Sequence, residues 1–96
     1  MDLKEKFKEI TSEMNDIFAR KNKDYGNSFS SSIDEFGPIA GVVRISDKFN
    51  RLKTLINSPD KSEVKDESLI DTLTDMANYC IMLRMELERI NNKIYE

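Results

Sequence analysis

The sequence predicts an all-α fold, a helical hairpin or bundle, in a single domain that covers residues 1–96. Apolar residues recur at steps of three and four along three long segments, which is the spacing of one helix face. No segment shows the alternation of a strand, and glycine, proline and serine residues cluster between the periodic segments. A chain of 96 residues is also the ordinary size of one domain.

The first helix is expected over about residues 2–23 and the second over about residues 38–57. Proline suits the start of the second helix because its missing N–H has no partner there in any case. The apolar stripe of the first helix consists of Leu3, Phe7, Ile10, Met14, Ile17 and Phe18. That of the second helix consists of Val42, Ile45, Phe49, Leu52 and Ile56.

The third helix is expected over about residues 67–94, with linkers over residues 24–37 and 58–66. Its inward face is expected to carry Ile70, Leu73, Ala77, Ile81, Leu87 and Ile90. At ~1.5 Å per residue this helix would be roughly 40 Å long, which is more than a three-helix monomer needs. Its second half is also apolar, with Met82 and Leu83, so we expect a homo-oligomer, a dimer or a tetramer, to complete the fold.

Charge and rare residue types exclude several classes of protein. A net charge of -3 argues against general nucleic-acid binding, which needs a basic surface. The single cysteine, Cys80, cannot form an internal disulfide, and no apolar run is long enough for a membrane span, so we expect a cytoplasmic protein without membrane contact. The sequence has no histidine, so any bound metal would have oxygen ligands, as magnesium and manganese do.

One face of the second helix is expected to carry a charged stripe. Its members are Arg44, Asp47, Lys48 and Arg51, at positions i, i+3, i+4 and i+7. The three cations offer charge-assisted donors at one-turn intervals, which suits a phosphate chain. Lys21 and Lys23, at the end of the first helix, are expected to add to the same site. The alternative is a solvated helix face on which Asp47 pairs with a neighbouring arginine.

An acidic stripe is expected along one face of the third helix. Glu67, Asp71, Asp75 and Asn78 follow one another at steps of four, four and three. Like charges one turn apart repel by a few tenths of a kcal/mol, so this stripe requires a cation nearby. The basic stripe of the second helix would supply one, and so would magnesium or manganese held by Asp47, Glu67, Asp71 and Asp75.

The segment over residues 21–28 carries aromatic and amide side chains in a polar setting. Tyr25, and Phe29 just beyond, offer rings on which a nucleobase can stack. Asn27 and Asn78 can read the edge of a base, because an amide both donates and accepts hydrogen bonds. The alternative is structural, since Gly26 favours a turn that would simply end the first helix.

Three motifs, in order along the chain, resemble the family called nucleotide modification associated domain type one. They are KDYG at residues 23–26, RISDKFNRL at residues 44–52 and ESLIDTLTDMANY at residues 67–79, and the resemblance extends from about residue 14 to about residue 88. The family is common in phages and in bacterial genomes that carry prophages. The resemblance therefore also implies that a phage-encoded copy would work in the host cytoplasm.

That family is in turn similar to the MazG-like all-α nucleotide pyrophosphohydrolases, whose four carboxylates hold magnesium. The resemblance implies that Asp75 matches the last of these carboxylates and that Tyr79 matches a tyrosine that contacts the nucleotide. It also implies that Asp47 stands for one glutamate of the first pair. Two positions depart from the pattern, because Arg44 and Thr72 stand where carboxylates are expected.

These residues leave three functions open. The first is magnesium-dependent hydrolysis of a nucleoside triphosphate, with a deoxynucleotide favoured, to a monophosphate and pyrophosphate, with Asp47 and Asp75 as the catalytic residues. The second is nucleotide binding without turnover, to sense or sequester a nucleotide or to assist base modification. In both, the residues that contact the nucleotide are Lys23, Tyr25, Arg44, Lys48, Arg51, Asn78 and Tyr79. The third is a structural or protein-interaction domain.

Overall fold

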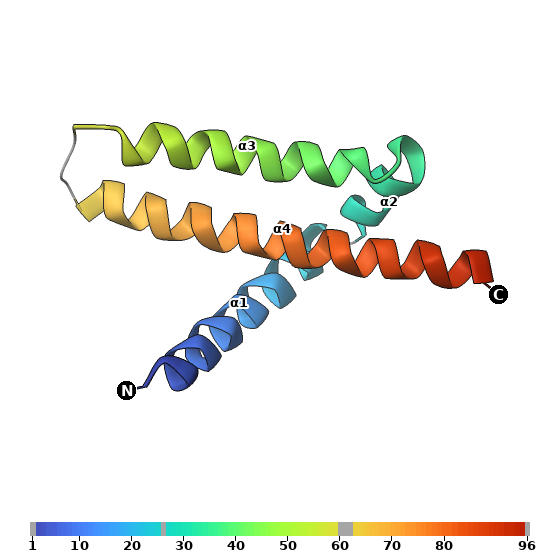
Figure 1. Cartoon of the computed structure of the whole chain (residues 1–96), viewed down its shortest axis with the longest axis horizontal. Helices are drawn as coiled ribbons and strands as arrows, with labels where there is room; N and C mark the ends of the chain where they lie inside the picture. Colours follow the sequence, from blue (N-terminus) through green and yellow to red (C-terminus); the bar gives the residue numbers. More distant parts are fainter. Residues whose placement is uncertain (1, 26, 60–62, 96) are drawn as a thin grey trace.

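The structure, a computed structural model, describes residues 2–25, 27–59 and 63–95, and its regular elements within these ranges are all helices. They are α1 (Leu3–Tyr25), α2 (Ser28–Phe36), α3 (Ile39–Ile56) and α4 (Glu63–Tyr95). Helices α3 and α4 lie side by side and antiparallel as a long hairpin, and α1 crosses α4 obliquely (Figure 1). The predicted all-α hairpin with the first helix across it is therefore confirmed.

Helix α1 is only partly covered by the rest of the chain. Its start is capped by Asp2, whose Oδ1 accepts a hydrogen bond of 2.8 Å from the Glu5 N–H. The N-terminal half of α1 extends away from the hairpin (Figure 1), so Leu3 and Phe7 on the predicted apolar stripe are exposed. Further along the same stripe, Met14 is buried against α4.

Helix α2 occupies most of the segment predicted to be a linker, so that prediction was wrong. The signal was present but short, because Phe29, Ile33 and Phe36 recur at steps of four and three. Ile33 is the most deeply buried large side chain of the described residues. Gly37 ends the helix with a φ of 85°, and its N–H donates a hydrogen bond of 2.8 Å to the Ile33 carbonyl. Helix α4 likewise begins before the predicted residue 67, at Glu63.

Gly41 is buried on α3 where that helix faces α4. A Cβ atom added there would lie 2.7 Å from Cδ1 of Leu83 and 3.3 Å from Cζ of Phe29. Distances this short leave no room for a methyl group unless the neighbours move. Gly41 therefore sets the separation of the hairpin at the end where α2 joins it.

A polar cluster attaches α2 to the second half of α4. The Ser30 hydroxyl donates to the buried carboxylate of Glu86, which also accepts a hydrogen bond of 2.6 Å from Nε of Arg89. The same guanidinium donates to Oδ1 of Asp34 at 2.8 Å. The hydrogen bonds to Asp34 and to Glu86 raise the pKa of Arg89 above its ordinary value. The carboxylate of Glu86 is thus buried with both a charged and a neutral donor.

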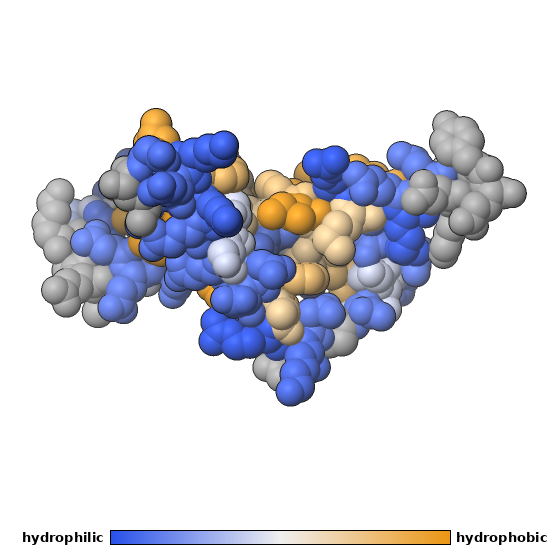
Figure 2. Space-filling view, turned by 90° about the horizontal axis from the view of Figure 1, so that it is seen from below, coloured by the Kyte–Doolittle hydropathy of each residue, from blue (hydrophilic) through white to orange (hydrophobic). Residues whose placement is uncertain are grey.

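The hydrophobic core within one chain is small. Among the described residues, Met14 and Ile33 are the only buried hydrophobic side chains, whereas fourteen large ones are exposed. Ile70, Leu73, Ile81 and Leu87, which the sequence predicted to face inward on the third helix, are all in the exposed group. Figure 2 shows apolar residues open to solvent in the middle of one face, with polar residues on both sides. No described helix combines the length and the hydrophobicity that a membrane crossing requires.

Candidate functional site

The carboxylate of Asp75 joins cations from two other helices. Nζ of Lys21, near the end of α1, lies 2.8 Å from Oδ1 of Asp75, and Nζ of Lys48 on α3 lies 3.5 Å from Oδ2. The Asp75 and Lys48 side chains are both about three-quarters covered, whereas that of Lys21 is more open. The basic stripe of the second predicted helix thus faces the acidic stripe of the third at this point, and α1 adds a cation as expected.

The two arginines of the basic stripe flank Lys48. Arg44 precedes Lys48 by four residues and Arg51 follows it by three, so all three side chains start from one side of α3. Arg44, Arg51 and Asp47 are exposed, and none of them forms an ion pair or hydrogen bond with another described residue. The ion pair between Asp47 and a neighbouring arginine is therefore absent among the described residues, whereas the exposure of all three side chains is also what a solvated helix face would show.

The other members of the acidic stripe lie apart from this ion-pair cluster. Glu67 and Asp71 are exposed and lie two turns and one turn, respectively, before Asp75 on α4. Within the described ranges, no three histidine, cysteine, aspartate or glutamate side chains are grouped closely enough to hold a metal ion. Thr72, which stands where the resemblance expects a carboxylate, is buried and donates a hydrogen bond of 2.7 Å to the Ser68 carbonyl. A metal ion at Asp75 would therefore need oxygen ligands beyond the described carboxylates of one chain, and the phosphates of a bound nucleotide are one source of them.

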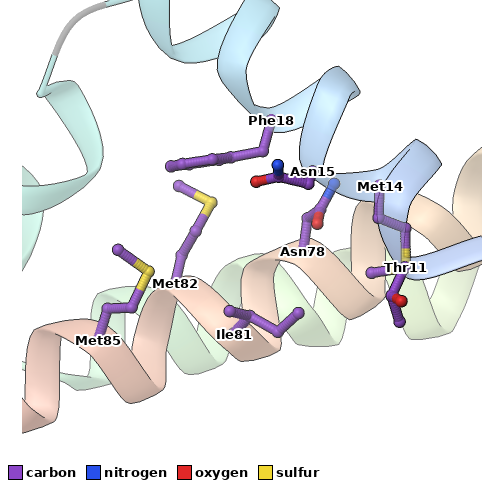
Figure 3. A pocket seen from close by; sticks show the side chains of 8 residues that line it. All are labelled: Thr11, Met14, Asn15, Phe18, Asn78, Ile81, Met82 and Met85. Atoms are coloured by element: carbon purple, nitrogen blue, oxygen red, sulfur yellow. The ribbon is translucent and has the colours of Figure 1, made fainter. Parts of the chain in front are cut away.

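A hollow of about 260 Å³ lies between α1 and α4, beside the ion-pair cluster. Its lining consists of Thr11, Met14, Asn15 and Phe18 from α1 and of Asn78, Ile81, Met82 and Met85 from α4. Figure 3 shows Asn15 and Asn78 extending from facing helices, with the Phe18 ring and Met82 reaching into the space beside them. Asn78 follows Asp75 by three residues, so the hollow and the ion pairs share one side of α4.

The remaining residues that the sequence predicted to contact the nucleotide lie away from the hollow or outside the described side chains. Tyr79 is half-buried and packs on Phe29, with ring centroids 5.8 Å apart and planes inclined by 40°, so it lies between α2 and α4 and does not line the hollow. The side chain of Tyr25 lies outside the described residues. Lys23 and Asn27 are exposed near the junction of α1 and α2. Of the predicted nucleotide contacts whose side chains are described, Asn78 lines the hollow and Lys48 belongs to the ion-pair cluster.

Sequence reasoning missed the α1 side of the hollow. Asn15 and Phe18 lie on the face of α1 that contacts α4, but spacing alone assigned Phe18 to a generic apolar stripe and gave Asn15 no role. An amide adjacent to such a stripe was the available signal, because a polar side chain at the edge of a buried face often has a specific partner.

The family model described as nucleotide modification associated domain 1 matches residues 21–87. The chain belongs to this family. The matched range contains Lys21, all of α3 and the part of α4 with Asp75 and Asn78, whereas the first part of α1, with Asn15 and Phe18, precedes it. Neither the curated proteins nor the solved structures include a significant match to this chain.

Proposed function

We propose that this chain binds a nucleotide on the α1 side of the hairpin, with its phosphates near Lys21 and Lys48 and its base in the hollow between α1 and α4. The observation that carries the proposal is the adjacency of the two features, since Asp75 and Asn78 lie one turn apart on α4. Membership of a nucleotide modification associated family supports a nucleotide as the ligand.

The phosphate end depends on cations drawn from two helices. Lys21 and Lys48 meet at Asp75, and Arg44 and Arg51 flank Lys48 along α3. An incoming phosphate chain would accept charge-assisted hydrogen bonds from these cations and compete with Asp75 for the two lysines. The arginines add planar, bidentate donors, which lysine cannot provide.

The base end depends on the size and chemistry of the hollow. Drug-sized ligands occupy pockets of roughly 300–1,000 Å³, so a hollow of about 260 Å³ suits one ring system better than a whole nucleotide. Phe18, Met82 and Met85 offer apolar surface to the faces of a flat base. Asn15 and Asn78 supply amides that match the mixed donors and acceptors of a base edge.

Calorimetric titration of the four common deoxynucleoside triphosphates tests the proposal. Lys48→Gln should weaken binding by roughly ten- to hundredfold, the range for losing about 1.5–3 kcal/mol of hydrogen bonding to a charged group. Asn78→Leu should weaken binding and change the order of preference among the four bases. Lys8→Gln removes the same charge from an exposed position on α1 and should leave all affinities unchanged. Equal affinities for wild type and Lys48→Gln would contradict the proposal.

Magnesium-dependent hydrolysis of the bound triphosphate is the second candidate, and the position of Asp75 at the phosphate end favours it. Magnesium is commonly held by one or two carboxylates together with substrate phosphates, so Asp75 is the residue that would contribute to such a site. The metal would supply a polarised phosphate and an activated water.

Asp75→Asn separates the two candidates. If the chain only binds, the substitution removes a negative charge beside the phosphates, and the nucleotide should bind more tightly by about 1 kcal/mol, the Coulomb energy of such a charge at about 4 Å in water. If the carboxylate holds magnesium, the substitution should abolish both magnesium-dependent binding and pyrophosphate release. Pyrophosphate release by the wild type, measured on the same nucleotide panel, completes the comparison.

A further inference from the structure

The chain exposes much more surface than a compact domain of its size. Its accessible surface is 7606 Å², whereas a folded monomer of 11.2 kDa is expected to expose about 5,700 Å². Its radius of gyration is 15.6 Å, against about 12.5 Å for a compact domain of this length. The excess area is roughly 1,900 Å². A standard interface buries only about 800 Å² per partner, so the excess corresponds to one partner's share of a large, permanent interface.

Part of this excess lies on two apolar stripes of the hairpin. Val42, Phe49 and Ile56 follow one another at steps of seven on α3, and their exposed fractions are 47%, 48% and 62%. Leu73, Cys80 and Leu87 follow one another at the same step on α4 and are also exposed. A step of seven keeps side chains on nearly one line of a helix and is the repeat by which helices pack along a seam.

The two stripes lie on the same side of the hairpin. Val42 follows Gly41 by one residue, and a Cβ atom added to Gly41 would lie 2.7 Å from Cδ1 of Leu83, so Gly41 faces α4. Leu73 follows the buried Thr72 by one residue, and Thr72 lies on nearly the same line of α4 as Leu83. One residue corresponds to a rotation of about 100° around a helix. In two antiparallel helices, equal rotations from the line of contact lead to the same side. Helix α1 occupies the opposite side of the hairpin. Its Lys21 contacts Asp75, and Asp75 is rotated by about 60° around α4 from Thr72, in the direction opposite to that of Leu73.

We propose that a second copy of this chain packs on these stripes, face to face across a twofold axis, so that two α3–α4 hairpins form a four-helix bundle. The stripes Val42–Phe49–Ile56 and Leu73–Cys80–Leu87 lie at its centre. The nucleotide-binding side of each hairpin then faces outward. The proposed dimer and the proposed nucleotide site therefore use different sides of the hairpin, and either proposal can fail without the other.

A second copy fits this face better than a different protein. A lone two-helix layer cannot enclose a core, and of the described hydrophobic side chains only Met14 and Ile33 are buried. A chain with so little core needs a permanent partner, and self-association through one self-complementary patch is the commonest solution. The surroundings of the stripes also suit a dimer rim: Lys53 lies 5.0 Å from the Phe49 ring centroid, and Arg84 pairs with Glu88 next to Leu87.

Light scattering after size-exclusion chromatography gives the first test. The wild type should have twice the mass of one 11.2 kDa chain at micromolar concentration. Phe49→Glu should shift the mass to that of a single chain, whereas Phe7→Glu, which places the same charge on an exposed apolar residue of α1, should leave the dimer intact. A monomeric wild type would overturn the proposal. So would a dimer broken by Phe7→Glu and not by Phe49→Glu, because the partner would then lie on α1.

The single cysteine gives a second test, which uses only the wild-type protein and so does not depend on whether a variant folds. Cys80 is exposed in one chain but would be covered in the dimer. Its reaction with a thiol reagent should be at least about tenfold slower in concentrated wild type than in denatured protein, and should accelerate on dilution as the dimer dissociates. Reaction at the denatured rate at every concentration would overturn the proposed interface.

Discussion

Gly41→Ala tests the close approach of α3 and α4, on which the hairpin depends. Alanine is the better helix former by about 1 kcal/mol, so at an open position the substitution would stabilise the protein. Here the new Cβ would lie 2.7 Å from Cδ1 of Leu83 and 3.3 Å from Cζ of Phe29. Overpacking of this kind costs about 1–3 kcal/mol, so the two effects together predict a net loss of about 1 kcal/mol. For a chain of this length such a loss lowers the Tm by about 4–8 °C.

Leu83→Ala supplies the matched background, because it removes the atom that the new methyl group would meet first. In that background Gly41→Ala should be neutral or stabilising by up to about 1 kcal/mol, which makes the two substitutions non-additive. Urea unfolding followed by circular dichroism, with all four proteins at one concentration, measures the cycle. Stabilisation by about 1 kcal/mol in both backgrounds would refute the reasoning, since the methyl group would then meet nothing.

Three further predictions concern other contacts. Arg89→Met leaves the buried carboxylate of Glu86 without its charged donor and should lower the free energy of unfolding, with much of the loss recovered by adding Glu86→Met; no recovery would contradict the polar cluster that attaches α2 to α4. Ile33→Ala should cost about 2–4 kcal/mol in the same assay because Ile33 is 2% exposed, and a loss under about 1 kcal/mol would mean that α2 does not dock there. Arg51→Gln should weaken triphosphate binding with little change in stability, and Arg51→Lys should recover only part of the affinity because lysine lacks the bidentate fork; identical titrations of all three proteins would remove Arg51 from the site.

The long helices were predictable because each carries many repeats of one spacing. Helix α3 was placed to within one residue at each end, and Pro38 marks its start as the sequence indicates. Helix α2 was not predicted because nine residues contain only two steps of the apolar spacing, and three consecutive serines suggested a linker. Its position is decided by long-range contacts, Ser30 with Glu86 and Asp34 with Arg89, which no local pattern reveals.

The candidate site was partly predictable for the same reason. Spacing placed Lys48 and Asp75 on the correct faces of their helices, and the hairpin brings them together. Spacing within one helix cannot show where a third helix crosses, so the hollow between α1 and α4, with Asn15 and Phe18, was missed. The third helix was predicted to bury its apolar stripe, but within one chain much of that stripe is exposed. Periodicity shows that one face of a helix is apolar, and it does not show which molecule covers that face.

Backbone amide chemical shifts, recorded while the four common deoxynucleoside triphosphates are titrated into the ¹⁵N-labelled protein, test the central claim most directly. The account predicts saturable shifts for at least one nucleotide in two segments that are far apart in sequence, residues 11–21 of α1 and residues 75–85 of α4, with further shifts around Lys48. Shifts confined to the hairpin stripes around Phe49 and Cys80, or no saturable shift with any of the four, would contradict it.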